Sequence, residues 1–140
     1  MLKTIQVEEN IQKCLADIQD SDILIKTLPS NANQYYQDIS NKKTIKIIIP
    51  LVTANKPNPT PLLRYEILIF ITLPNRTKDD EAKVLYSLDE TKDEVINLIL
   101  NNYHKYQCFN SIYFNSYRLE PAEGGMWRAE VNFILEKYAS

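Results

Sequence analysis

The feature that most constrains this chain is a pair of adjacent glycines, Gly124-Gly125, the only two glycines among its 140 residues. Average usage of about 7% would place roughly ten glycines in a chain of this length. Glycine takes up positive φ without a clash at Cβ, so the pair, standing between two β-type runs, predicts a hairpin turn. The same scarcity excludes glycine-rich phosphate loops, dinucleotide-binding fingerprints and nucleophile elbows elsewhere in the chain.

The runs on both sides of the glycine pair are predicted as strands, over residues 111–120 and 126–137. In the second run, every other residue from Trp127 to Leu135 is apolar, and the residues between them are polar except Ile134. This period of two places one face against a core and leaves the other to solvent or a partner.

Three further strands are predicted over residues 23–28, 43–52 and 64–73. The run 64–73 is apolar at every second position, and its other face is also half apolar, as Leu68 and Phe70 show. A strand of this kind is covered at least partly on both sides, so we expect it to be central in the sheet.

Two helices are predicted by their apolar spacing. The first covers residues 4–19, with Glu8 and Glu9 expected on its polar side. The second begins after Asp80 and continues to about residue 102. Its start stays open, because capping-box patterns begin at both Ser87 and Thr91. The expected apolar stripes contain Val7, Ile11, Cys14, Leu15 and Ile18 in the first helix, and Leu88, Val95, Ile96, Ile99 and Tyr103 at the second.

Together these elements predict a single α+β domain over residues 1–140, in the order α-β-β-β-α-β-β. Strands joined by short links favour antiparallel pairing, and two amphipathic helices can cover one face of a sheet. We therefore expect a two-layer sandwich, with a mainly antiparallel sheet of about four to five strands covered by two helices.

Charge and cysteine content narrow the functional classes. The net charge is −2, so no overall basic field attracts nucleic acid or anionic lipid. Two cysteines, Cys14 and Cys108, are too few for a disulfide framework, and Cys14 is expected to be a buried free thiol. The amino-terminal residues contain no apolar signal core, and no apolar run approaches the ~20 residues of a membrane span. We expect a soluble, cytoplasmic protein.

The residue types needed for catalysis are poorly represented. His104 is the only histidine, follows the second helical stripe, and is expected at the surface or as a helix cap. Neighbouring carboxylates such as Glu8-Glu9 and Asp79-Asp80 are expected at helix amino termini rather than in an acid–base pair. Glu120, Glu123 and Glu130 flank the glycine turn and could bind a divalent cation, although any charged hairpin offers the same grouping. We predict no catalytic residue, no cofactor and no metal.

Surface loops and the last hairpin supply the candidate contacts. The segment 55–61 contains three prolines at alternate positions, which favours a rigid, exposed loop that contacts a partner, or a simple spacer between antiparallel strands. Arg118 and Arg128 are expected across from each other on the last hairpin, with Tyr117 nearby, and form a weak nucleic-acid candidate that Glu120 and Glu130 largely offset. The candidate protein-interface residues are Asn55, Lys56, Pro57, Pro59, Arg76, Lys78, Arg118 and Arg128.

The order of elements, the central run Arg64-Tyr65-Glu66-Ile67-Leu68-Ile69-Phe70-Ile71 and the last hairpin around Gly124-Gly125-Met126-Trp127 resemble phage tail terminators. These are the tail-completion proteins of contractile phages and related injection systems. The resemblance implies a non-enzymatic, typically hexameric ring that binds the end of a completed tail tube, stops its polymerisation and joins it to the sheath or head connector. The partners it implies are further copies of the chain and the tube and sheath proteins, without direct binding of nucleic acid or membrane. It also implies that the loops 55–61 and 74–80 and the exposed strand edges make the contacts.

Two alternatives belong to other functional classes. The first is a small intracellular adaptor or immunity-type protein that binds one partner without forming a ring. The second is an enzyme with carboxylate chemistry.

Overall fold

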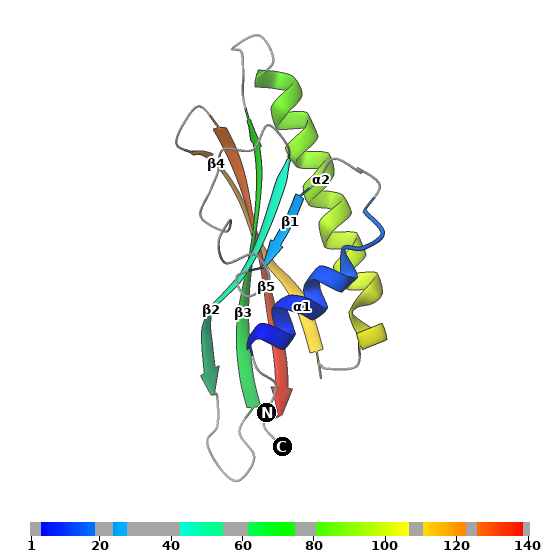
Figure 1. Ribbon diagram of the computed structural model, residues 1–140. Coiled ribbons are helices and arrows are strands. Elements are labelled where there is room, and N and C mark those ends of the chain that lie inside the picture. Colours follow the sequence, from blue (N-terminus) through cyan, green and yellow to red (C-terminus); the bar gives the residue numbers. More distant parts are fainter. Residues whose placement is uncertain are drawn as a thin grey trace.

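A computed structural model describes residues 4–18, 24–27, 43–54, 62–74, 81–106, 111–122 and 126–138. Two α-helices and five strands follow one another along the chain, and a short 3₁₀-helix continues the second α-helix (Figure 1). The elements are α1 (Thr4–Cys14), β1 (Leu24–Thr27), β2 (Thr44–Ala54), β3 (Leu62–Pro74), α2 (Glu81–Asn102), η2 (Tyr103–Tyr106), β4 (Ser111–Ala122) and β5 (Met126–Tyr138).

The strands form one sheet in the order β1-β2-β3-β5-β4. Four of them, β2 to β5, pair antiparallel, and β3 lies at the centre, as predicted. β3 and β5 are partners along their whole length, from Leu62 opposite Tyr138 to Pro74 opposite Met126. The predicted last hairpin is confirmed by the pairing of Ala122 with Met126. The two glycines that predicted it lie outside the described residues.

The first strand is the exception to antiparallel pairing. β1 runs parallel to β2, with Leu24 opposite Thr44 and Thr27 opposite Ile47. A parallel neighbour needs a connection of about a dozen residues or more, and residues 28–43 provide that length. The antiparallel pairing that we expected for strands joined by short links therefore does not hold for β1 and β2, whose connection is long.

Both helices lie on the same face of the twisted sheet, and this confirms the α+β two-layer sandwich (Figure 1). The hydrophobic core lies between the two layers. Alternate residues of β3 and β5 point into it, because successive side chains of a strand point to opposite faces. The core includes Val7, Ile11, Cys14 and Leu15 from the α1 region, Tyr65, Ile67, Ile69 and Ile71 from β3, Leu88, Val95 and Ile99 from α2, and Ala129, Val131, Phe133 and Leu135 from β5.

The first helix is shorter than predicted, and one of its carboxylates lies elsewhere than expected. α1 ends at Cys14, and the next residues form a tight turn in which the Leu15 amide donates to the Gln12 carbonyl at 3.1 Å. Glu8 is buried, with 4% of its surface exposed, whereas the prediction placed it on the polar side. It stands three residues before Ile11 and seven before Leu15, so helical spacing puts it beside the apolar stripe. Glu8 and Glu9 also lie beyond the first turn, so the predicted helix-end role is wrong for them.

The second helix covers Glu81–Asn102, so it begins directly after Asp80 and ends at residue 102, as predicted, and its start lies ten residues before the capping-box pattern at Thr91. Thr91 is buried within it: its hydroxyl donates to the Ser87 carbonyl at 2.8 Å and accepts a hydrogen bond from Lys43 Nζ at 2.8 Å. Both capping-box predictions are therefore wrong. A threonine hydroxyl can bond the preceding turn as well as a free helix end, and here the tertiary contact with Lys43 accompanies the first arrangement.

Candidate protein interface

The sheet face opposite the helices carries a hairpin charge cluster, made of Arg118, Glu120, Arg128 and Glu130. In the β4–β5 register Glu120 is opposite Arg128, and Arg118 is opposite Glu130. Arg128 Nε donates to Glu120 Oε1 at 3.1 Å, and Arg128 Nη2 donates to the same oxygen. Arg118 lies within 3.8 Å of Glu120 and 3.7 Å of Glu130. The four side chains thus alternate in charge across the two strands.

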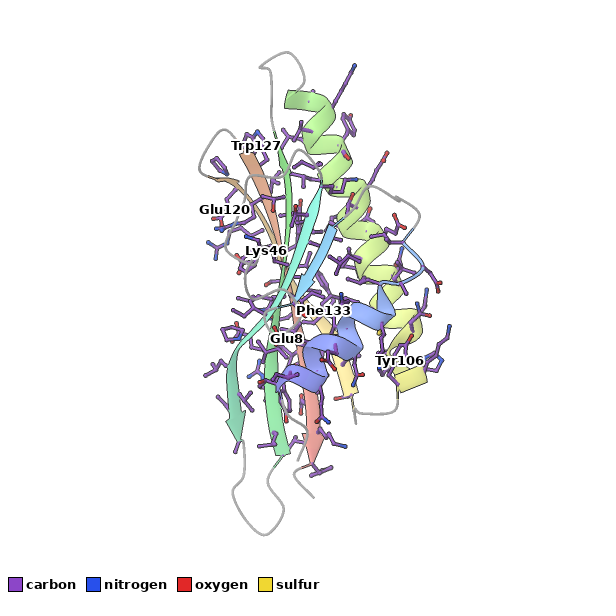
Figure 2. All side chains as sticks on the ribbon, in the orientation of Figure 1. Glu8, Lys46, Tyr106, Glu120, Trp127 and Phe133 are labelled. Carbon is purple, nitrogen blue, oxygen red and sulfur yellow. The ribbon has the colours of Figure 1, made fainter. Side chains whose placement is uncertain are left out.

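The cluster neutralises its own arginines. The hydrogen bond from Arg128 lowers the pKa of Glu120, and the guanidinium of Arg128 also lies 5.0 Å from the centre of the Phe70 ring. The side chain of Arg118 remains 69% exposed. Because each arginine faces a carboxylate, the cluster lacks the uncompensated positive charge that phosphate binding requires. Figure 2 shows Glu120 towards the hairpin end of the sheet, where Trp127 also lies.

Tyr117 does not belong to the surface that Arg118 forms, so their predicted grouping is wrong. It lies opposite Val131, a core residue, and faces α2. Neighbouring residues of a strand point to opposite sides of the sheet, and this separates Tyr117 from Arg118. The expectation that Arg118 and Arg128 lie across from each other is also wrong, because they share a face but Arg118 is opposite Glu130 and Arg128 is opposite Glu120.

A chain of hydrogen-bonded polar side chains beside the cluster was not predicted from the sequence. Asn115 Nδ2 donates to Asn132 Oδ1 at 3.2 Å, and Asn132 Nδ2 donates to Glu66 at 3.1 Å. Three strands, β4, β5 and β3, are linked in this way. The position of Asn132 on the polar side of β5 was visible in the alternation. The register shift between Phe114 and Ser116, next to Asn115, was not.

An apolar groove of about 320 Å³ separates α2 from β4. From α2 it is lined by one helical stripe, in which residues three or four apart share a side. From β4 it is lined by Tyr117 and Leu119. Tyr86 is 74% exposed at its rim, although aromatic side chains of this size are usually covered. The α2 stripe consists of Ala82, Leu85, Tyr86 and Asp89.

The charges that border this α2–β4 groove are compensated within the chain. Lys92 Nζ lies 3.0 Å from Asp89 and 2.8 Å from Asp93, and 4.7 Å from the centre of the Tyr117 ring. The hydrogen bond with Asp93 is the main cause of the raised pKa of Lys92. Burial raises the pKa of Tyr117. The groove therefore presents an apolar surface with little net charge.

Two strand edges of the described sheet are open. β4 has β5 on one side, and no other described strand pairs with it. β1 covers β2 only from Thr44 to Ile47, so residues 48–54, here called the free half of β2, form the other open edge. Six of the nine large hydrophobic side chains that are exposed within the described residues lie on these edges or at the groove. They are Leu51, Val52, Tyr86, Tyr113, Phe114 and Leu119.

Most of the other residues that we singled out in the sequence lie outside the part of the chain that the structure describes. Asn55, Lys56, Pro57, Pro59, Arg76 and Lys78 lie outside the described residues, as does Glu123. His104 is exposed in η2, as expected, with its ring 6.0 Å from that of Tyr103. Cys14 is a buried free thiol, as predicted, and burial raises its pKa to about 11.

Within the described ranges, no three His, Cys, Asp or Glu residues are grouped as metal ligands, and none of the helices is long and apolar enough to cross a membrane. The chain matches no protein-family model and no curated protein.

Proposed function

We propose that this chain is a non-enzymatic assembly protein that caps the end of a phage-like tail tube. In this role several copies form a closed ring, six by the resemblance described above, which ends tube polymerisation and joins the tube to the sheath or connector. Assembly takes place in the cytoplasm, where the ring becomes part of the tail particle.

The observation that supports this proposal is the concentration of exposed hydrophobic side chains at the open strand edges and the α2–β4 groove. Exposed apolar patches rimmed by polar residues are typical of protein–protein contact sites. Open strand edges are templates for pairing with another chain unless they are covered. The two open edges lie on opposite sides of the sheet, and a ring needs two different contact surfaces on each subunit.

The internally neutralised charges support protein partners over nucleic acid. Arg118 and Arg128 both face carboxylates, and Lys92 lies between two aspartates. The two arginines were the basis for the weak nucleic-acid interpretation of the hairpin, and their charge is compensated. The apolar strand edges are therefore the better candidates for contact surfaces.

The adaptor alternative has one observation in its favour. A single subunit already forms the α2–β4 groove, so one copy could bind an extended partner there without a ring. Sedimentation velocity separates the two functions, since an adaptor stays monomeric at all protein concentrations and in the presence of tail tubes.

The direct test is tail length in cells that lack the protein. Negative-stain images of particles from these cells should show overlong, uncapped tubes, and supplying the chain from a plasmid should restore uniform lengths. Tubes of normal length and normal ends in its absence would refute the proposal. Mass measurement of the purified chain with isolated tubes provides the second readout, because a bound ring adds a multiple of the 16.3 kDa subunit.

A further inference from the structure

We propose that the free half of β2 in one copy adds as a strand to β4 of the next copy, beside α2. This inference rests on the proposed ring and identifies its subunit contact. It is an instance of β-augmentation, in which main-chain hydrogen bonds along a sheet edge provide affinity and side-chain pockets provide specificity.

The donor is a strand segment with little cover. β1 stops pairing with β2 at Ile47, and residues 50–54 are all exposed. Leu51 is 50% exposed and Val52 is 38% exposed, although both are large and apolar. From Leu51 to Ala54 the strand keeps a regular register with β3, so its backbone is held extended and its outer edge is ready to pair. Figure 1 shows this part of β2 at the margin of the sheet, away from β1.

The acceptor is the β4 edge with the groove beside it. From Ser116 to Ala122, β4 is in regular register with β5, which occupies one of its two edges. Tyr117 and Leu119 point towards the α2 side and line the groove. A strand added to β4 would place every second side chain over this groove. Val52 is a suitable occupant because it lies on the α2 side of its own sheet, opposite Tyr65.

The absence of charge favours the free half of β2 as the strand that docks on β4. Residues 47–54 contain no charged side chain, whereas β3, β4 and β5 each carry two or more. Charged side chains that border the acceptor are paired with one another, as in Asp89–Lys92 and Arg118–Glu130. A neutral strand can therefore dock without leaving an unpaired charge, while a charged strand would lose hydration for little compensation.

The geometry favours a second copy's β2 over a second copy's β4. Pairing of β4 with β4 would be two-fold symmetric and would leave Leu51 and Val52 exposed in both copies. Pairing of β2 with β4 covers both open edges of every copy and repeats from one copy to the next, which closes a ring when the rotation allows it.

The contact is short, and this has a consequence for assembly. The regular part of the donor, from Leu51 to Ala54, has four residues and spans roughly 13 Å, and a single contact of this length falls below the ~1,200 Å² that a stable pairwise interface buries. One contact is therefore weak, and ring closure, in which every copy makes two contacts, stabilises the assembly. We expect self-association to rise steeply with protein concentration.

Photo-crosslinking tests which elements meet. Val52 is replaced by p-benzoylphenylalanine in a ¹⁵N-labelled copy, which is mixed with the unlabelled chain at high concentration, irradiated and mapped by mass spectrometry. The expected intermolecular products join position 52 to β4 or to the stripe from Ala82 to Asp89. The same photo-crosslinking residue at Leu100, which is 37% exposed on α2, is the control. Crosslinks from position 52 to another copy's β2, or yields no higher than in the Leu100 control, would overturn the inference.

A charged substitution provides the second test. Leu51→Lys places a charge on the proposed donor and should weaken self-association about tenfold or more in sedimentation velocity, because edge lysines block strand pairing. Leu100→Lys, a matched change at another exposed leucine, should leave it unchanged. Equal effects of the two substitutions would contradict the inference.

The two proposals can fail separately. If the chain caps tubes while position 52 never crosslinks to β4 or α2, the ring function stands and the β2–β4 contact is wrong. If the crosslink forms while tails from cells lacking the chain have normal lengths, the contact stands and the capping function is wrong.

Discussion

The side-chain amide of Asn102 donates a 3.1 Å hydrogen bond to the main-chain carbonyl of Cys14, across 88 residues of sequence. The last carbonyls of a helix have no partner within it, and Asn102 provides one at the end of α1. The Tyr106 hydroxyl donates to the neighbouring Lys13 carbonyl at 3.3 Å. The end of α2 and the following η2 therefore cap α1, and the two helices are held together where they cover the sheet.

Replacing this buried amide should destabilise the fold. Asn102→Ala leaves the Cys14 carbonyl without its side-chain partner and should lower the free energy of unfolding by about 1–3 kcal/mol. Urea denaturation followed by circular dichroism measures the loss. Asn101→Ala is the matched control, because Asn101 is exposed one residue earlier in the same helix. Equal losses in the two variants would show that the Asn102 hydrogen bond has no special weight.

The buried thiol of Cys14 should make stability depend on alkaline pH. Its pKa is raised by burial from 9.0 to about 11, so the folded state holds the proton more tightly than the unfolded state. The stabilisation is fully present below pH 9 and is lost as the pH rises through 11, and the loss at pH 11 amounts to about 2 kcal/mol. Urea midpoints measured from pH 8 to pH 11 should fall more steeply in the wild type than in Cys14→Ala. Parallel curves for the two proteins would contradict the assignment. The same burial should make Cys14 react with thiol reagents only after unfolding.

The ion pair of Glu120 and Arg128 should make the stability of the fold depend on pH in the acid range. The hydrogen bond from Arg128 lowers the pKa of Glu120 below its ordinary value of 4.5. Its contribution to stability is present above that value and is lost as the pH falls through the lower, folded-state pKa. A carboxyl ¹³C titration by NMR should place the Glu120 midpoint below 4.5, and Arg128→Met should move it upward. Arg64→Met, on the same sheet face outside the cluster, should not move it. An unchanged midpoint in Arg128→Met would show that the ion pair is not the cause.

The faces of the elements were predictable because they depend on local periodicity. The alternation from Trp127 to Leu135 identified the core side of β5, and helical spacing identified Val7 and Ile11 of α1. The glycine pair likewise predicted the hairpin that joins β4 to β5, since a positive φ is a local requirement.

The ends of the helices were less predictable, since they depend on distant residues. α1 ends at Cys14, where Asn102 and Tyr106 donate hydrogen bonds to its last carbonyls. α2 continues through Thr91, whose hydroxyl accepts a hydrogen bond from Lys43, outside the helix. The candidate interface was likewise predictable only in part from the sequence. Sequence placed Arg118 and Arg128 on the last hairpin, but the groove also requires α2 to lie beside β4.

The sequence by itself determined which stretches form strands and helices, which apolar residues face the core, and that no glycine-rich phosphate loop exists. Only the tertiary structure decided that β1 pairs parallel with the first four residues of β2, that β4 lies at an edge, and that five of the nine large exposed hydrophobic residues of the described ranges lie on these two edges. The physical reason is that a strand's period of two specifies its faces but not its neighbours. Its neighbours are selected by packing the whole chain around one core, and the strand edges left open follow from that selection.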